Sequence, residues 1–279
     1  MMRVNLRSRQ TMWGIVAIAL SGLIFLLPFV FILLTASKPL AESNLLEFSW
    51  PSEFLLWENL KEAISARDYV MLGAFFNSVT LTVISVTLLV LLSAMVGWIW
   101  ARRPGKVASI VNLIVIGGLT LPPAVVPTIW VLQSVGLFKT MSGLVLVEVA
   151  LGLPFCIILF RAFISSIPRE IDEAAIVDGA GPIRLFFQVI FPMLRSVVVT
   201  VVILQTVTIY NDFENPLYFL PGAGNETIQM ALFNFKSQFL TQYNLLFASV
   251  LLIVIPPLIM FILFNRKIVD GMTAGALKG

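Results

Sequence analysis

Four polar side chains recur at helical spacing within an apolar stretch near residue 210. Gln205, Thr208, Asp212 and Asn215 stand at positions i, i+3, i+7 and i+10, so a continuous helix would carry them on one face. We call these four residues the polar stripe. A polar group left without a partner in lipid costs several kcal/mol. The polar stripe is therefore expected to face a cavity or another helix.

The chemistry of the polar stripe suits hydrogen bonding to a solute. Amide, hydroxyl and carboxylate groups can bond the hydroxyls of a sugar, and the neighbouring rings of Tyr210 and Phe213 can stack on its C–H faces. A solute pathway is therefore one interpretation. The other is that residues 210–215 mark only the end of a membrane helix at the interface, and the spacing does not decide between the two.

The residue types on which most enzymes depend are scarce. The sequence has no histidine and one cysteine, Cys156, which excludes histidine acid–base chemistry, histidine metal ligation and a disulfide framework. Gly105 and Lys106 lack the further glycines and the hydroxyl residue of a nucleotide-binding P-loop. We expect no catalytic residue, no metal site and no cofactor in this chain, so a partner must bind any ATP that drives it.

Composition indicates the class of protein that must position the polar stripe. Hydrophobic residues make up 59% of the 279 residues and charged residues 12%, with a mean hydropathy of +0.98. A membrane-spanning helix needs about 20 largely apolar residues. The prediction is an all-α polytopic membrane protein with one transmembrane domain over residues 1–279. Its six predicted spans are residues 12–36, 75–100, 107–135, 143–163, 196–216 and 245–265.

Two of these spans contain residues that need special surroundings. The third span holds Pro122, Pro123 and Pro127, and such prolines free backbone carbonyls, so we expect a bend that faces protein or a wet cavity. Pathway lining is one explanation of that bend, and the general frequency of proline in membrane helices is the other. Glu148, near the outer end of the fourth span, is expected to find a polar partner or water.

The distribution of Lys and Arg predicts the orientation. Thirteen of the 18 basic residues fall on the side of both termini and of the loop at 165–195, which is therefore predicted to be cytoplasmic. The first span follows Arg3, Arg7 and Arg9, but its apolar run is too long for a signal peptide and five spans follow it. The net charge of +3 is explained by this topology and requires no nucleic-acid partner.

The loop at 165–195 is a polar island between two apolar runs. Pro168 stands at a first helical position and acidic residues follow it, which predicts a short helix to about Asp178. Gly179 and Gly181 permit a sharp turn, and Pro182 restarts a second helix. The expected product is a helix-turn-helix.

Each of these two short helices has an apolar face. In the first helix this face is small, which lets another backbone approach closely, and its residues are Ile171, Ala174 and Ala175. In the second helix the apolar residues recur at i, i+3, i+4 and i+7, and they are Ile183, Phe186, Phe187 and Ile190. We expect the island to fit into a groove on another protein.

The island also has Glu-Ala-Ala at 173–175, Asp-Gly-Ala at 178–180, and Ile190 and Pro192 at its end. This pattern resembles the cytoplasmic EAA loop of ABC importer permeases, although Phe191 stands where Leu is usual and Ser196 where a second Pro often stands. The alternative is an amphipathic connector on the membrane surface. The resemblance implies that the residues coupling the chain to an ATPase are Glu173, Ala174, Ala175, Asp178 and Gly179.

Two further patterns narrow the resemblance. The fifth span ends in Asn-Asp-Phe at 211–213 and Pro-Leu at 216–217, similar to the Trp-Asn-x-Phe and Pro-Leu pattern of carbohydrate-importer permeases, with Tyr210 replacing the Trp. The tail has Gly-Met-Thr-Ala-Gly-Ala at 271–276 and Lys-Gly at 278–279, which closely resembles the smaller maltose-type permease, although Asn265 stands where Gln is usual.

In that family the outer loop, here 217–244, reaches toward the binding protein, and the tail, here 266–279, contacts the ATPase dimer. The tail residues implied in this contact are Gly271, Thr273, Ala274 and Gly275. The candidate substrate pathway comprises Gln205, Thr208, Tyr210, Asn211, Asp212 and Asn215.

The resemblance implies the permease subunit of a bacterial ABC importer for a mono- or oligosaccharide, with the type I fold and a location in the cytoplasmic (inner) membrane. Such a subunit forms half of the translocation pathway and pairs with a second related permease, which the resemblance favours as a different chain. The other implied partners are two cytosolic ATP-binding subunits, which bind ATP and Mg²⁺, and an extracytoplasmic sugar-binding protein.

Two other classes of protein would require features that this sequence does not show. An ion-coupled secondary transporter of a small polar solute would show repeated halves with broken helices and buried ionisable residues. The sequence has no convincing internal repeat. An intramembrane enzyme without histidine would need paired carboxylates inside the membrane, and Glu148 and Asp212 are both predicted near the outer edge of their spans.

Overall fold

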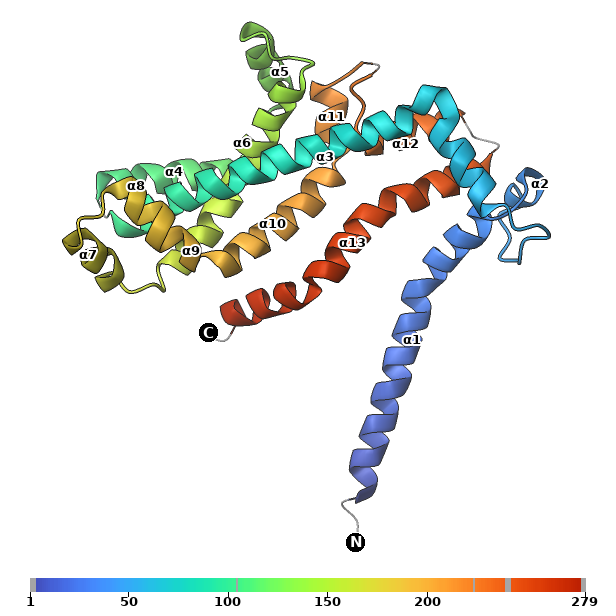
Figure 1. The fold of residues 1–279 in the computed structure, drawn as a ribbon, viewed down its shortest axis with the longest axis horizontal. Coiled ribbons are helices and arrows are strands. Elements are labelled where there is room, and N and C mark those ends of the chain that lie inside the picture. The colour runs from blue at the N-terminus through green and yellow to red at the C-terminus, as the bar shows by residue number, and fades with distance from the viewer. Residues whose placement is uncertain (1–3, 104, 223, 239–241, 277–279) are drawn as a thin grey trace. The chain divides into compact units, whose positions relative to one another are not determined.

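The computed structural model describes residues 4–103, 105–222, 224–238 and 242–276, and within these residues the fold is helical without strands (Figure 1). This confirms the predicted all-α class. The helices in chain order are α1 (Val4–Ala36), α2 (Leu40–Ser43), α3 (Leu56–Arg102), α4 (Lys106–Thr120), α5 (Val125–Ser134), α6 (Met141–Ile164), α7 (Glu170–Val177), α8 (Pro182–Arg184), the π-helix η1 (Leu185–Ile190), α9 (Phe191–Met193), α10 (Arg195–Tyr210), α11 (Glu214–Phe219), α12 (Ile228–Gln238) and α13 (Tyr243–Ala276).

The chain divides into two compact units. The first comprises Met1–Met71 and Leu232–Ile255, and the second comprises Leu72–Ala231 and Pro256–Gly279. The second unit contains the polar stripe and the polar island, so it is the unit that positions the candidate site.

In the first unit a buried lysine organises the segment between α1 and α3. The Nζ of Lys38 donates to the carbonyl of Glu47 at 2.7 Å and to the Oγ of Ser49 at 3.0 Å, and Lys38 is 1% exposed. Asn59 donates to the carbonyl of Lys38 at 3.0 Å and accepts from Asn244 at 2.8 Å. These bonds satisfy buried polar groups and join α1, α3 and α13 within this unit.

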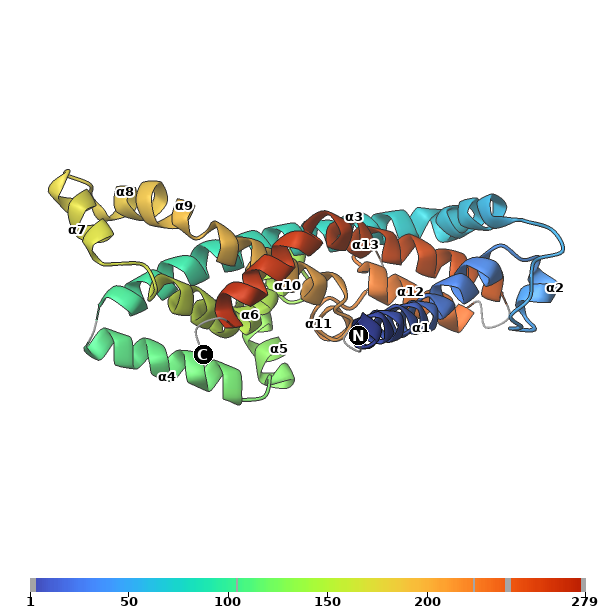
Figure 2. The ribbon, with the colours of Figure 1, turned by 90° about the horizontal axis from the view of Figure 1, so that it is seen from below.

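In the second unit α6 is the central helix. Helices α4, α10 and α11 pack against it, and α4 runs beside it in Figure 2. Its buried residues include Cys156 and Phe160, which are both fully buried. Cys156 is a free cysteine within this core, so its role is packing.

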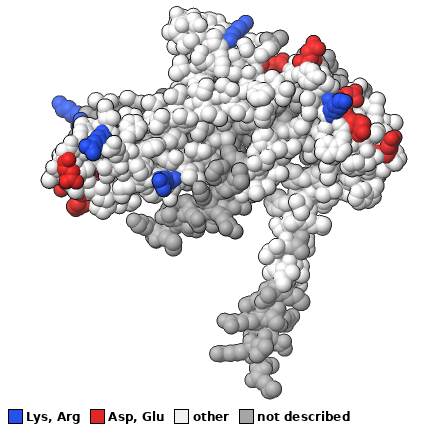
Figure 3. All heavy atoms as spheres, in the orientation of Figure 1, with Lys and Arg blue, Asp and Glu red and all other residues white. Residues whose placement is uncertain are grey.

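Length and composition identify membrane-spanning candidates among the described residues. Three single helices qualify, at Trp13–Ala36, Asp68–Arg102 and Met141–Ile164, and the number rises to five if each of two bent pairs counts as one span. Tyr243–Ile259 in α13 is a shorter apolar helix. The count of six spans stays a prediction. Figure 3 shows charged side chains over α7 and α8 and very few along the middle of α3.

The third predicted span is bent, as its prolines indicated. The chain bends by 118° between Ala108–Thr120 and Val125–Ser134. Leu121, the residue before Pro122, has an extended backbone with φ −81° and ψ 131°, because a residue before proline is disfavoured in the helical region. The two consecutive prolines also lack the N–H groups that would continue the helix. The break is therefore dictated locally by the sequence.

Gly143, in the first turn of α6, is a position where a side chain has no room. A Cβ built there would lie 2.1 Å from the carbonyl oxygen of Leu137. We expect Gly143→Ala to force a backbone shift and to destabilise the protein by about 1–3 kcal/mol. The midpoint of thermal unfolding in detergent measures this effect.

Gly117→Ala is the matched control for that substitution. A Cβ at Gly117 in α4 meets nothing within 4 Å, so the alanine should leave stability unchanged or raise it by up to about 1 kcal/mol through helix propensity. Equal unfolding midpoints for the two variants would contradict the close approach at Gly143.

Candidate functional site

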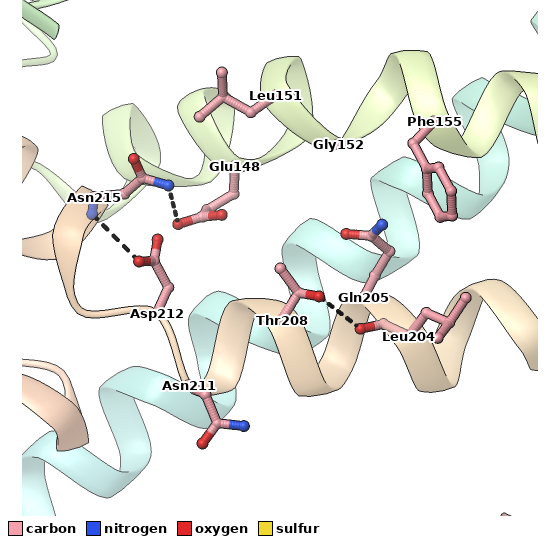
Figure 4. Close-up of a pocket in the computed structure, with 10 residues that line it drawn as sticks. All are labelled: Glu148, Leu151, Gly152, Phe155, Leu204, Gln205, Thr208, Asn211, Asp212 and Asn215. Atoms are coloured by element: carbon pink, nitrogen blue, oxygen red, sulfur yellow. Dashed lines mark hydrogen bonds between the residues drawn. The ribbon is translucent and has the colours of Figure 1, made fainter. Parts of the chain in front are cut away.

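The polar stripe lies on one wall of a cavity between α6 and the α10–α11 segment. The volume of this cavity, which we call the polar cavity, is about 670 Å³. Figure 4 shows the side chains from the two segments facing each other across it. The lining residues are Glu148, Leu151, Gly152, Phe155, Leu204, Gln205, Thr208, Asn211, Asp212 and Asn215.

Helical spacing explains the α6 wall and the part of the other wall that lies in α10. The α6 wall uses positions i, i+3, i+4 and i+7, and its residues are Glu148, Leu151, Gly152 and Phe155. The other wall is formed by Leu204, Gln205 and Thr208 of α10, by Asn211 and Asp212 after it, and by Asn215 of α11. Gly152 allows the walls to approach, because a Cβ there would lie 3.0 Å from Leu89 of α3 and 3.3 Å from the Oε1 of Gln205.

The prediction of one continuous helix over 196–216 was wrong. Helix α10 ends at Tyr210, and α11 begins at Glu214. Asp212 occupies the break, where its Oδ1 accepts from the backbone N–H of Glu214 at 2.9 Å and of Asn215 at 3.4 Å. A short aspartate side chain competes well for local N–H groups and so favours such a break over a continuing helix.

The break nevertheless brings the whole polar stripe to one cavity. Asn215 turns toward α6, and its Nδ2 donates to the Oε1 of Glu148 at 3.2 Å. Glu148, which is 6% exposed, thereby has the polar partner that its position in an apolar span predicted. Glu148 and Asp212 also share this cavity, although they lie far apart in the sequence.

Tyr210 and Phe213 do not belong to this cavity. The described residues that line it include neither of them, and its aromatic ring is Phe155 of α6. Tyr210 is 5% exposed and lines a separate cavity of about 180 Å³ with Thr82 and Pro256. Tyr210 stands two residues after Thr208, which places it about 200° around the helix from the stripe. Tyr210 therefore lies away from the polar cavity, and its role in a substrate pathway stays a prediction.

Among the described residues that line the polar cavity, the ionisable ones are all acidic. Its described lining contains two carboxylates, Glu148 and Asp212, and neither lysine nor arginine. The remaining polar groups are amides and a hydroxyl, of which the Thr208 hydroxyl donates to the carbonyl of Leu204 at 2.9 Å. Such a lining can donate and accept hydrogen bonds but offers no cation to an acidic solute.

The polar island folds as the predicted helix-turn-helix. Helix α7 covers Glu170–Val177, and Gly179 turns the chain with φ +81°, a left-handed conformation that favours glycine. The second helix runs from Pro182 to Met193 and contains the π-helix η1. We call residues 170–193 the coupling segment.

The coupling segment exposes different residues from those predicted. Ile171 and Ala175 pack against the chain's own core, whereas Ile176 and Val177 are 57% and 86% exposed. In the second helix Phe186 and Ile190, which were expected on a face that fits another protein's groove, are buried in the chain's own core. Ile183 is 77% exposed and Leu185 is buried, because the wider π-helical turn shifts the register of the apolar face.

The residues that the EAA resemblance singled out lie on the outer face of α7 and its following turn. Glu173, Ala174, Asp178 and Gly179 are exposed, and Ala175 is partly buried. These exposed groups include backbone and small side chains that another protein can approach closely. Their role in coupling stays a prediction.

A buried ion pair anchors the coupling segment to the end of α3. The Nη2 of Arg102 lies 2.7 Å from the Oδ2 of Asp172, and their side chains are 12% and 11% exposed. The contact is a charge pair rather than a well-aligned hydrogen bond, since this oxygen has no hydrogen-bond partner. Both Nη atoms of Arg102 also donate to the carbonyl of Ile167 at 3.1 Å.

Trp98 extends this anchor to the second helix of the segment. Its Nε1 donates to the Oδ1 of Asp172 at 3.1 Å, and its ring lies 5.5 Å from that of Phe186. Trp98 and Arg102 are four residues apart and therefore share one face of α3. One face of α3 thus holds both helices of the coupling segment.

The remaining predicted regions are described in part. The outer loop is tied to α3, because Asn77 donates to the carbonyl of Glu226 at 3.1 Å and Ser78 accepts from the N–H of Ile228 at 2.8 Å. In this loop residues 223 and 239–241 lie outside the described residues. The tail continues helix α13 to Ala276, which includes residues 271–275, and residues 277–279 lie outside the described residues.

No group of three or more histidine, cysteine, aspartate or glutamate residues is placed to hold a metal within the ranges that the structure describes.

Comparisons with known proteins agree on one family. Residues 93–273 match the family model described as binding-protein-dependent transport system inner membrane component. The diacetylchitobiose uptake system permease protein NgcG of Streptomyces coelicolor is 32% identical over 267 residues, covering 92% of this chain and 85% of that protein. The melibiose/raffinose/stachyose import permease protein MelC of Bacillus subtilis is 28% identical over 257 residues, covering 91% of each.

The fold also matches a solved structure. A chain of a bacterial ABC transporter involved in the import of the acidic polysaccharide alginate superposes with a TM-score of 0.78 and 17% identity. The match covers 92% of this chain and 97% of that one. At this level of identity the match establishes a common fold.

Proposed function

This chain belongs to the family of binding-protein-dependent transport system inner membrane components, and from this premise we propose that it forms half of the translocation pathway of an ATP-driven sugar importer. It is a multi-pass protein of the inner membrane and a transport subunit rather than an enzyme. The relatives that import diacetylchitobiose, and melibiose, raffinose or stachyose, support a mono- or oligosaccharide as the solute.

The polar cavity carries the proposed pathway. Its volume of about 670 Å³ lies within the range of about 300–1,000 Å³ that is usual for small-molecule sites. Its amides, hydroxyl and carboxylates match the alternating donors and acceptors of a sugar, and the ring of Phe155 offers an apolar surface for stacking. The solute would pass these groups as the cavity opens to one side and then to the other.

The charge of the residues that line the cavity further limits the class of solute. Glu148 and Asp212 are acidic, and no cation stands among the described residues that line the cavity. An anionic sugar would meet like charge there without a compensating arginine or lysine. An uncharged sugar therefore fits this lining better than an acidic one.

The coupling segment provides the proposed connection to ATP hydrolysis. Its outer face exposes Glu173, Ala174, Ile176 and Val177, while the inner face is fixed to α3 through Asp172. A push on the outer face would reach α3 through Asp172. It would also reach α10, which forms part of the wall of the polar cavity, through α9. Such coupling requires that ATP and solute bias the same two conformations of the permease.

The proposed complex contains partners with separate tasks. Two cytosolic ATP-binding subunits would hold ATP and Mg²⁺ and contact the coupling segment and the tail at 271–275. A second related permease would complete the pathway. An extracytoplasmic sugar-binding protein would dock on the outer loop at 217–244, and the family's dependence on a binding protein supports this partner.

Removing single hydrogen-bonding groups from the polar cavity tests the pathway. We expect Gln205→Leu and Thr208→Val each to reduce sugar uptake by roughly 2- to 10-fold, the loss of one hydrogen bond of about 0.5–1.5 kcal/mol. Uptake of labelled sugar by proteoliposomes that hold the complete transporter, compared at equal amounts of protein, measures this.

Thr200→Val is the matched control. Thr200 lies in the same helix and its hydroxyl donates to the carbonyl of Ser196 at 3.1 Å, just as Thr208 donates to Leu204, but Thr200 does not line the cavity. Its uptake should equal that of the wild type. Equal uptake by all three variants would remove the polar cavity from the pathway.

A further inference from the structure

A second polar pocket lies where α3 ends and α4 begins. We call it the headgroup pocket, and its volume is about 440 Å³. It is formed by the last turn of α3, the first turns of α4 and the last turn of α6. The lining residues are Trp100, Ala101, Gly105, Ala108, Ser109, Asn112 and Arg161. These three helix ends lie on the side that the basic residues predict to be cytoplasmic, so the pocket is at the level of the inner leaflet's surface.

Arg161 gives this pocket a positive charge that is already oriented. Its guanidinium carbon lies 3.7 Å from the centroid of the Trp100 ring, a cation–π contact that holds the planar group against the wall. Arg161 is exposed, and it makes no ion pair with any carboxylate in the described part of the chain. Its N–H groups are therefore available to an anionic ligand.

The start of α4 adds further anion-binding groups. Gly105 stands at the N-cap with φ +109°, no side chain caps the helix, and its first turn contains no acidic residue. The first backbone N–H groups of a helix have no internal partners and lie at the positive end of the helix dipole. Lys106 adds a side-chain charge at the same end. This arrangement favours a phosphate group.

Asn112 is an independent sign of an amphipathic ligand. It stands two turns into an otherwise apolar helix, is exposed, and has no hydrogen-bond partner among the described side chains and backbone groups. It lies about 9 Å along the helix axis from Lys106, among the apolar residues of α4. A polar side chain there requires a partner such as an ester or glycerol oxygen.

We propose that the headgroup pocket binds an anionic phospholipid of the cytoplasmic leaflet. The phosphodiester would lie between the Arg161 guanidinium and the start of α4, with the glycerol backbone extending toward Asn112. Basic pockets between membrane helices on the cytoplasmic side are suited to such lipids. A soluble phosphate would satisfy Arg161 and the helix end but would leave Asn112 without a partner.

The position of the pocket links the lipid to the coupling segment. Trp100 faces the pocket, while Trp98 and Arg102, on the opposite face of the same turn, hold Asp172 of α7. A bound lipid would therefore steady the end of α3 to which the coupling segment is fixed. The inference about lipid binding does not depend on which solute is transported.

Lipid retention by the purified complex tests the proposal. The transporter is purified through a tag on this chain, placed in nanodiscs of phosphatidylcholine with or without phosphatidylglycerol, and the lipids retained after transfer to detergent are identified by native mass spectrometry. The wild type should retain phosphatidylglycerol in preference to phosphatidylcholine. Arg161→Gln should reduce that retention by roughly 10-fold, the loss of a charge-assisted bond. Asn112→Leu should reduce it less, and Arg161→Lys should restore part of it.

A control variant and three contrary results complete the test. Lys139→Gln removes one positive charge that also lies over a ring, that of Phe138, but on the predicted outer side, so it should not change retention. Equal retention of the two lipids, or equal losses in Arg161→Gln and Lys139→Gln, would overturn the proposal. Displacement of the retained lipid by soluble glycerol phosphate would show a site for a soluble anion instead and would also overturn it.

Discussion

Replacing Glu173 by lysine is expected to reduce ATP-driven sugar uptake by at least about 10-fold, while the amount of permease in the membrane stays unchanged. Glu173 is exposed on α7, next to Ala174 and on the side away from the anchor at Asp172. Removing one member of a charge pair at a protein interface costs about 2–5 kcal/mol, and reversing its charge adds repulsion. The effect should therefore fall on the contact with the ATPase rather than on the fold of the permease.

Two companion variants define what this result means. Glu173→Gln keeps the size and removes the charge, so its loss of uptake should be smaller than that of Glu173→Lys. Ser166→Lys adds a positive charge at an exposed position before α7 and should leave uptake unchanged. Uptake and co-purification of the ATPase are measured for each variant. Wild-type values for Glu173→Lys would show that the outer face of α7 is not the ATPase contact.

The second large effect is expected at Asp172, where stability rather than partner binding should change. Asp172→Ala leaves the Arg102 guanidinium buried without its counter-charge and removes the acceptor of the Trp98 N–H. Breaking one side of a buried ion pair costs about 3–5 kcal/mol. We expect a clear decrease in the unfolding midpoint of the purified complex. We also expect a loosened coupling segment, so that the ATPase subunits hydrolyse ATP without productive sugar uptake.

A double variant distinguishes this cause from general damage. Asp172→Leu combined with Arg102→Met removes both charges and should recover much of the stability, because well-packed apolar groups can replace a buried pair. The single variant Glu173→Ala, one residue away on the exposed face, should keep the wild-type unfolding midpoint. A midpoint for Asp172→Ala equal to that of the wild type would contradict the anchoring role of the pair.

The features of the fold and the candidate site that depend on neighbouring residues in the sequence were predictable. The helical spacing of Gln205 and Thr208 placed both on one face, and the cost of polar groups in lipid required a cavity or a partner for that face. The consecutive prolines after Leu121 broke the third span for reasons that depend on adjacent residues alone. The turn at Gly179 likewise follows from the freedom of glycine at positive φ.

Other features depend on contacts that no local pattern encodes. Asp212 ends α10 by accepting backbone N–H groups, yet the chain returns so that Asn215 still reaches Glu148, 67 residues away. The pair of Arg102 and Asp172 joins segments 70 residues apart, so neither residue's spacing indicates the other.

Two local patterns in the sequence also bear on which side chains line the polar cavity. Glu148 and Gly152 are four residues apart in α6 and so share the face that lines the cavity. Tyr210 is two residues from Thr208, which places it on the opposite side of the helix from the polar stripe.

The shift from Ile183 to Leu185 in the buried face of the coupling segment came from a π-helical turn. The occurrence of such a turn depends on packing rather than on residue type.

The most direct test of the central claim is transport by a defined complex. The chain is tagged and purified in mild detergent from its native membrane, the proteins that accompany it are identified, and the preparation is reconstituted into proteoliposomes for uptake of a labelled sugar with and without ATP inside. We predict that ATP-binding subunits and a second permease accompany the chain, and that uptake requires both ATP and the sugar-binding protein. A chain that purifies alone and takes up solute without ATP, driven by a proton or sodium gradient, would contradict the account.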